Sequence, residues 1–304
     1  MTRRYHVFVN ADAGSVTETE QQTKEITDRF REAAVDATVT AVDPELLADA
    51  MRDVWESGTD AIVIAGGDGT VNCAAGVAVE VGMVLGVLPM GTFNHFAKDL
   101  GVPQDLAAAV EYLADAPVEA IDVGEVNGTV FVNNASIGVY PKMVGLRDAI
   151  RERHGWGKVR AVPVAVIGTL RRLPTHRLRL TIDDNATVTV ATPFLFVGNG
   201  LFDQHGERLG KRTSLADHRL GVYVIATNSR LRLIANAITA RVRGIDAAGA
   251  TDRRAAEGLV VDSDDGAVEI ALDGEPTELR VPLHFRSRAG ALRVLATSTD
   301  RNGD

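Results

Sequence analysis

The sequence is poor in cysteine: among 304 residues, only Cys73 carries a thiol. A single cysteine excludes a disulfide within the chain, so we expect the reducing environment of the cytoplasm. We interpret Cys73 as a small buried residue on a helix and not as a nucleophile.

Long apolar runs are also lacking. None reaches the roughly 18 residues needed to span a bilayer. The first ten residues, MTRRYHVFVN, lead directly into a strand-like pattern without the apolar region and cleavage site of a secretion signal. The mean hydropathy of +0.02 is typical of a soluble globular protein.

Positive charge is in deficit overall, with a net charge of −9, and we therefore expect no nucleic-acid partner. The deficit is uneven, because residues 143–179 hold nine Lys and Arg against two acidic residues, and residues 228–244 add four arginines. Such basic, partly apolar segments favour peripheral contact with an anionic lipid surface, here the inner face of the membrane. Ordinary amphipathic helices packed on a domain remain the alternative.

The first 120 residues alternate strand-like and helix-like patterns. Near-continuous apolar runs, such as residues 61–66 and 84–89, are typical of a parallel sheet covered by helices on both faces. A helix is expected over residues 17–34, and another that begins with Asp43 as its N-cap and Pro44 in its first turn.

The pattern changes near residue 122. Asn127-Gly128 lies between two β-prone runs and predicts a hairpin, and further strand-turn-strand patterns follow to the end of the chain, with helical segments near 141–172 and 229–243. We predict an α/β fold of two domains: a Rossmann-like domain with a parallel sheet, and an antiparallel β-sandwich. The first spans residues 1–122 and about 287–304, and the second spans 123–286.

A glycine-rich turn, GGDGT at residues 66–70, follows the buried run 61–65 and precedes a helix-like segment. Free backbone N–H groups at a helix start favour an anion, and glycines admit positive φ and close approach of a phosphate. The turn therefore predicts a phosphate site. It is neither a dinucleotide fingerprint, since Asn72 stands at the last glycine position, nor a Walker A loop. A plain strand-to-helix turn capped by Asp68 fits the glycines equally well.

A second loop, PMGTFNHFAKDLG at residues 89–101, repeats this pattern after the next strand. Because parallel strands end at one edge of a sheet, we expect the two loops to face one another there, where open α/β sheets bind ligands.

These motifs, with VGNG at 197–200 and LDGEP at 272–276, resemble the diacylglycerol kinase catalytic-domain family, which includes bacterial lipid kinases and sphingosine kinases and is related in fold to NAD kinases. The resemblance covers nearly the whole chain. It implies transfer of the γ-phosphoryl group of ATP to a lipid hydroxyl, with diacylglycerol as the default acceptor and phosphatidic acid as the product. It also implies that the C-terminal segment 291–300 returns to the first domain.

Site residues carry over by motif. The resemblance implies that the nucleotide is held by Asn10, Gly66, Gly67, Asp68, Gly69, Thr70, Asn72, Gly91, Thr92 and Asn94. It makes Asp68 and Glu275 catalytic, with Glu275 as the proton acceptor. A carboxylate suits this role because an alcohol is a poor nucleophile until its proton is removed.

The chain departs from the family pattern at the expected magnesium network. His95 replaces an aspartate, and the Asp-Gly-x-Leu stretch reads Asp217-His218-Arg219-Leu220, which keeps one carboxylate. Because imidazole is a poor ligand for Mg²⁺, we expect a magnesium ion that arrives with ATP, with Asp217 as the remaining metal-binding candidate.

Two other functions stay open. One is a soluble kinase acting on NAD, which shares GGDGT, and the other is a nucleotide-binding sensor without turnover, which the changes at His95 and His218 favour. The sequence does not name the acceptor lipid, and it leaves open a homodimer formed through an edge strand of the sandwich.

Overall fold

The computed structural model describes five stretches of the chain: residues 3–11, 16–138, 175–203, 212–225 and 251–297. The chain divides into two compact units. Unit 1 comprises Met1–Val123, Ser214–Ala216 and Arg288–Asp304, and unit 2 comprises Gly124–Thr213 and Asp217–Ser287.

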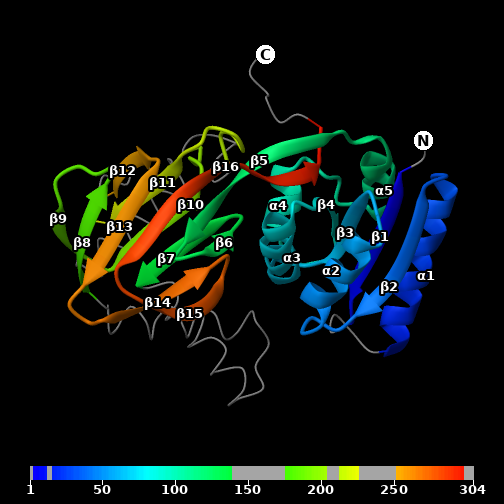
Figure 1. Cartoon of the computed structure of the whole chain (residues 1–304), viewed down its shortest axis with the longest axis horizontal. Helices are drawn as coiled ribbons and strands as arrows, with labels where there is room; N and C mark the ends of the chain where they lie inside the picture. Colours follow the sequence, from blue (N-terminus) through cyan, green and yellow to red (C-terminus); the bar gives the residue numbers. More distant parts are fainter. Residues whose placement is uncertain (1–2, 12–15, 139–174, 204–211, 226–250, 298–304) are drawn as a thin grey trace. The chain divides into compact units, whose positions relative to one another are not determined.

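Unit 1 is built on a mainly parallel sheet (Figure 1). Its elements in chain order are β1 (Arg4–Asn10), α1 (Val16–Glu32), β2 (Asp36–Val42), α2 (Leu47–Glu56), β3 (Ala61–Gly66), α3 (Asp68–Val81), β4 (Val84–Pro89), α4 (His95–Asp99) and α5 (Leu106–Asp115). The strands lie in the order β2-β1-β3-β4. All six residues of β3 are buried, as the apolar run predicts for a strand covered on both faces.

Helices pack on this sheet in pairs. α1 contacts α5, and α2 contacts α3. Glycine and aspartate mark their ends: α3 stops at Gly82, whose φ of 72° is the left-handed conformation of a helix C-cap, and Asp105 caps α5 by accepting a hydrogen bond from the Ala108 amide at 3.1 Å.

Two local expectations for unit 1 are wrong. α2 begins at Leu47 and not after Asp43, because the Asp43 side chain accepts from the Glu45 amide at 2.9 Å and its carbonyl from Leu46, which makes a separate turn. Cys73 is exposed, since the buried face of α3 is formed by other positions, among them Ala74 and Ala78.

The last strand, β16 (Leu283–Leu295), confirms the expected return of the C-terminal segment to the first domain. Arg293 and Val294 pair in parallel with Val84 and Leu85 of β4, on the side of β4 opposite to β3. Leu292 and Leu295 are fully buried.

The described residues of unit 2 form antiparallel strands. They are the last three residues of β5 (Val118–Val126), then β6 (Thr129–Phe131), β7 (Asn134–Gly138), β8 (His176–Ile182), β9 (Val188–Thr192), β10 (Phe194–Asn199), β11 (Leu220–Ile225), β12 (Thr251–Ala256), β13 (Gly258–Ser263), β14 (Ala267–Leu272), β15 (Glu275–Arg280) and the first part of β16. The predicted hairpin joins β5 and β6, with positive φ of 48° at Asn127 and 88° at Gly128.

These strands form two sheets. One has the order β12-β11-β10-β7-β14-β15, and the other contains β16-β13-β8-β9. A single buried core joins alternate residues of both, for example Ile137 and Leu195 from the first with Leu178 and Leu259 from the second. The predicted α/β-plus-sandwich fold class is therefore confirmed.

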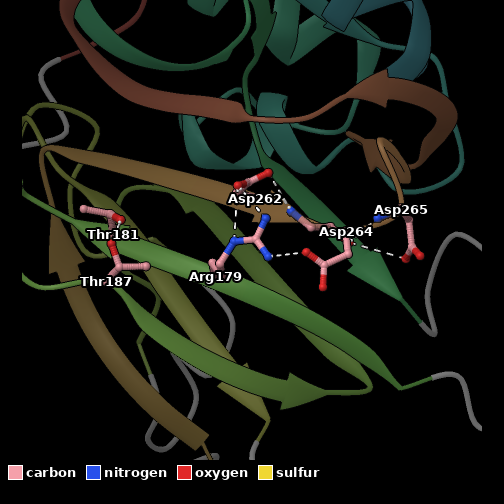
Figure 2. Close-up of polar contacts among 7 residues, drawn as sticks. Arg179, Thr181, Thr187, Asp262, Asp264 and Asp265 are labelled. Carbon is pink, nitrogen blue, oxygen red and sulfur yellow. Dashed lines mark hydrogen bonds and ion pairs between the residues drawn. The ribbon is translucent and has the colours of Figure 1, made fainter.

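The outer surface of the second sheet carries an ionic cluster (Figure 2). Arg179 of β8 stands directly opposite Asp262 of β13 and donates to its carboxylate at 2.7 Å, and it also contacts Asp264. These interactions raise the pKa of Arg179, with the Asp264 hydrogen bond as the largest cause. Arg179 is thus committed to neighbouring carboxylates.

Several sequence expectations fall outside the described residues. They are the basic segments except for 175–179, and the helical segments near 141–172 and 229–243. In the part of the chain that the structure does describe, there is no helix long and apolar enough to cross a membrane.

Candidate functional site

The strand order of unit 1 contains a topological switch point. β1 pairs with β2 on one side and with β3 on the other, so the connections after β1 and β3 leave the sheet in different directions. The carboxyl edge at such a point is where open α/β sheets bind ligands. Asn10 ends β1 and Gly66 ends β3 at this edge, and the Asn10 Nδ2 donates to the Thr70 Oγ1 at 3.0 Å.

The glycine turn leads from β3 directly into the first turn of α3. Gly67 is the N-cap and makes no side-chain cap, and the first amide with a helical partner is that of Val71, which donates to the Gly67 carbonyl at 3.1 Å. The N–H groups of the preceding residues are therefore available at the positive end of the helix dipole. Asp68, Gly69 and Thr70 form this first turn.

Positive φ is not what the glycines of this turn supply. Gly67 has φ of −90°, and Gly66 and Gly69 are not among the residues with positive φ. A Cβ on Gly66 would lie 3.0 Å from the Cβ of Thr70, so this position is tight. The expectation of positive φ is therefore wrong, and the close approach of a phosphate stays a prediction.

The second loop lies against the first, as the motif spacing predicts. Pro89 pairs with Gly66, and the Met90 amide donates to the Gly66 carbonyl at 3.1 Å. A Cβ on Gly91 would stand only 2.6 Å from the Gly67 Cα. The two loops thus touch backbone to backbone at the carboxyl edge.

Asn94 holds the second loop in shape. Its Oδ1 accepts from the Gly91 amide at 2.8 Å and its Nδ2 donates to the Gly91 carbonyl at 3.0 Å, while its own φ is 51°. Asn tolerates this left-handed conformation better than most residues. Thr92 and His95 are exposed on the same loop, and His95 stacks on Phe93 with ring centroids 5.6 Å apart.

Asn72 presents a buried acceptor close to the turn. Among the residues that the structure describes, its Oδ1 has no hydrogen-bond partner. Buried amides without partners are rare and costly, so the atom needs an explanation. A metal-bound water would donate a hydrogen bond to this oxygen. If the amide is flipped, its Nδ2 would instead donate to a phosphate oxygen.

In unit 2, Glu275 is the first residue of the edge strand β15 and is exposed. It follows a two-residue turn, Asp273-Gly274, in which φ is 48° and 97°. The Asp273 carboxylate accepts hydrogen bonds from the amides of Val132, Asn133 and Asn134 at 2.7, 2.8 and 2.8 Å. Burial raises the pKa of Asp273 to about 6, against the lowering effect of these hydrogen bonds.

A buried polar cluster that motif reasoning missed surrounds this turn. Arg212 donates to the Val132 carbonyl at 2.7 Å, and Asn199, from the VGNG motif, donates to the same carbonyl at 3.0 Å. Asn199 in VGNG and Asp273 in LDGEP are the available signals, because both motifs mark these positions but give them no role.

Asp217 is half-buried, and its Oδ1 accepts a long contact of 3.4 Å from the Arg219 amide. His218 has φ of 59°, so this position keeps the left-handed conformation that a glycine adopts without strain. No group of three or more His, Cys, Asp or Glu residues suited to a metal occurs in the described stretches. Asp217 as a metal ligand stays a prediction.

The chain combines two features. A parallel α/β unit carries two glycine-rich loops at the carboxyl edge of its sheet, and a β-sandwich carries the exposed carboxylate of Glu275 on an end strand. This combination is the two-domain architecture that the motifs predict. The family model of the diacylglycerol kinase catalytic domain matches residues 4–126. A probable YegS-like lipid kinase of Pseudomonas aeruginosa is 30% identical over 266 residues, covering 81% of this chain and 80% of the relative. The chain therefore belongs to the diacylglycerol kinase catalytic-domain family of lipid kinases.

Other relatives match over shorter stretches. A probable YegS-like lipid kinase of Klebsiella pneumoniae is 37% identical over 39% of this chain and 41% of its own length. The diacylglycerol kinase of Bacillus subtilis is 43% identical over 26% of this chain and 27% of its own. The crystal structure of a diacylglycerol kinase from Bacillus anthracis aligns with a TM-score of 0.69 at 18% identity, covering 97% of both chains, which shows a shared fold.

Proposed function

We propose that this protein is an ATP-dependent lipid kinase that transfers the γ-phosphoryl group of ATP to a lipid hydroxyl, with diacylglycerol as the acceptor and phosphatidic acid as the product. The observation that carries the proposal is the pair of touching glycine loops at the switch point of unit 1. Only glycine fits at Gly91. The amides at the start of α3, beside this contact, are the kind of group that favours an anion such as a polyphosphate, which supports the proposal.

In the proposed reaction, the amides of the Gly67–Thr70 turn hold the phosphates of ATP, with Asn10 orienting Thr70 through the 3.0 Å hydrogen bond. Gly91, Thr92 and Asn94 contribute from the second loop. Mg²⁺ bound with ATP would neutralise charge on the transferred group. Asp68, in the first turn of α3, and Asn72, with its unpartnered oxygen, are the side chains that would contact the metal or its waters.

We propose Glu275 as the general base. As the lipid hydroxyl oxygen bonds to the γ-phosphorus, the bond from that phosphorus to the β,γ-bridging oxygen breaks and ADP leaves. Glu275 takes the hydroxyl proton. Its exposure on an edge strand leaves the carboxylate accessible to a substrate.

The test is mass spectrometry of lipids after incubation of the protein with ATP, Mg²⁺ and a mixed bacterial lipid extract. We expect phosphatidic acid, and a Glu275→Gln variant should form it at a rate lower by roughly 10²- to 10⁴-fold. Glu278→Gln is the matched control, since Glu278 is an exposed carboxylate on the same strand. A wild-type rate for Glu275→Gln would refute the assignment of the base.

The alternatives give different results in this experiment and in a parallel lipid-free assay with ATP, Mg²⁺ and NAD. Phosphorylation of NAD in the absence of lipid would identify an NAD-kinase-like enzyme. Nucleotide binding without any phosphorylated product would identify a sensor. A phosphorylated lipid other than phosphatidic acid would keep the kinase and change the acceptor.

For location and partners, we propose peripheral contact with the inner membrane face, carried by the basic segment 143–179. Arg179 is occupied by Asp262 and Asp264, so the attraction must come from other residues of that segment. A homodimer would form through an end strand of the sandwich sheets, such as β9. Vesicle sedimentation with and without anionic lipid, and sedimentation velocity, test these two proposals.

A further inference from the structure

Arg212 is a buried cation in unit 2, with 7% of its surface exposed. A buried guanidinium is costly unless its N–H groups are hydrogen-bonded. Its Nη1 donates to the carbonyls of Val132 at 2.7 Å and Asn199 at 3.4 Å, and its Nη2 donates to the Asn133 Oδ1 at 3.3 Å. The guanidinium therefore lies against the carbonyl side of the short connection between β6 and β7.

The same connection meets the Asp273 carboxylate through its N–H groups. The amides of Val132, Asn133 and Asn134 all donate to it, at distances of 2.8 Å or less. The N–H and C=O groups of a peptide carry opposite partial charges. In the Val132–Asn133 peptide, the carbonyl accepts from Arg212 and the N–H donates to Asp273, so the cation and the carboxylate orient this peptide together.

Asn199 makes two further hydrogen bonds to carbonyl groups of this connection. Its side chain donates to the Val132 carbonyl at 3.0 Å, and its amide donates to the Asn133 carbonyl at 2.9 Å. The strand end that carries the VGNG motif is thereby connected to the same three residues.

Asp273 links residues 132–134 to Glu275 through the turn between β14 and β15. Asp273 and Gly274 are the two turn residues between β14 and β15, and the next residue, Glu275, pairs with Leu272 across the turn. The Asp273 amide also donates to the Asn134 carbonyl at 2.8 Å, so both the side chain and the backbone of the turn are anchored.

We propose that Arg212 is a positioning residue for Glu275: by binding the Val132 carbonyl and the Asn133 side chain, it fixes the connection whose amides bind Asp273, and hence the turn that carries the base. This inference rests on the proposed function, because Glu275 is the proposed base. Arg212 itself is not assigned a contact with substrate.

The first measurement is steady-state kinetics of Arg212→Lys and Arg212→Met with radiolabelled ATP and a mixed lipid extract. A base displaced by about 1 Å loses on the order of 100-fold in rate, so we expect kcat to fall by tenfold or more. KM for ATP should stay within about twofold, since the phosphate loops belong to unit 1. Arg212→Lys should retain more activity than Arg212→Met. Arg179→Met, which removes a half-buried arginine of unit 2 on the outer surface of the second sheet, is the control with wild-type kcat.

A double-mutant cycle with Glu275→Gln separates positioning from general damage. If Arg212 acts through Glu275, Arg212→Met should change kcat by less than about twofold in the Glu275→Gln background. A tenfold loss in both backgrounds would overturn the inference and leave the proposed function intact. A wild-type rate for Glu275→Gln alone would instead refute the base.

Amide hydrogen exchange gives a readout that needs no activity. Residues 132–134 and 272–277 should exchange at least tenfold faster in Arg212→Met than in the wild type, while Arg179→Met leaves them unchanged. Unchanged protection in a folded variant would overturn the inference. Should Arg212→Met fail to fold, Asn133→Ala, which removes one acceptor of Arg212, replaces it with the same expected direction.

Discussion

Gly91 has no room for a side chain, because the Cα of Gly67 lies only 2.6 Å from the position that a Gly91 Cβ would take. The second contact of such a Cβ would be the Asn94 Oδ1 at 2.8 Å. Since both neighbours belong to the loops proposed to bind ATP, the fold and the ligand site depend on the same close backbone approach.

Gly91→Ala should therefore lower both stability and ATP affinity. Overpacking costs roughly 1–3 kcal/mol, and here one neighbour is backbone, which cannot rotate away. We expect a lower melting temperature and at least tenfold weaker ATP binding by calorimetry. Gly67→Ala is the stability control, because its Cβ would lie 3.4 Å from the Gly91 Cα. A wild-type melting temperature for Gly91→Ala would contradict the close approach.

The hydrogen bond from Asn10 to Thr70 should matter for ATP binding. Thr70→Val keeps the side-chain shape and removes the hydroxyl, at a cost of about 1 kcal/mol in stability. We expect a several-fold rise in KM for ATP. Thr23→Val, which removes a hydroxyl bonded to the Thr19 carbonyl in α1, should leave KM unchanged. Equal KM values for the two variants would exclude a role of this hydrogen bond.

Two glycines of α3 should respond in opposite directions to alanine. A Cβ on Gly76 meets nothing within 4 Å, so Gly76→Ala should stabilise the protein by about 0.5–1 kcal/mol through helix propensity. Gly82 has φ of 72°, and Gly82→Ala should destabilise it by about 1–2 kcal/mol. Denaturant unfolding checks both values. A loss of stability on Gly76→Ala would show that the site is filled.

Asp273 should make stability depend on pH. Its pKa in the folded protein is about 6 against an ordinary value of 3.8, so the folded state binds this proton more tightly than the unfolded state. The free energy of unfolding should fall as pH rises from about 4 to about 6, by on the order of 3 kcal/mol, and stay level above.

Denaturant unfolding of the wild type and Asp273→Asn across this range isolates the effect, because the difference between the two proteins should follow the same curve. Carbon NMR of the Asp273 carboxyl should titrate with a midpoint near 6. A midpoint near the ordinary value would mean that the carboxylate is well hydrated.

Local patterns were sufficient for much of the fold. The apolar runs predict β3 and β4, and Asn127-Gly128 predicts the hairpin that the structure shows. The facing of the two glycine loops followed from parallel strand geometry, since Gly66 pairs with Pro89. In each case the signal lies in a few consecutive residues.

What escaped prediction depends on contacts between residues far apart in sequence. Arg212 meets Val132, 80 residues away, and Asp273 meets Asn133, 140 residues away, and neither pair leaves a periodic trace. The turn at Asp43 was missed because the same residue types serve an N-cap and a tight turn. Cys73 was misplaced because small residues occupy both faces of α3.

The pairing of β16 with β4 has a consequence for synthesis on the ribosome. When residues up to Val123 have emerged, β4 has β3 on one side, but its other neighbour, Arg293-Val294, is still about 170 residues from being made. At 5–20 residues per second, this wait lasts roughly ten to thirty seconds. During this wait, one edge of β4, a strand of six mostly buried residues, lacks its native partner. A fragment ending at Val123 should therefore aggregate during expression.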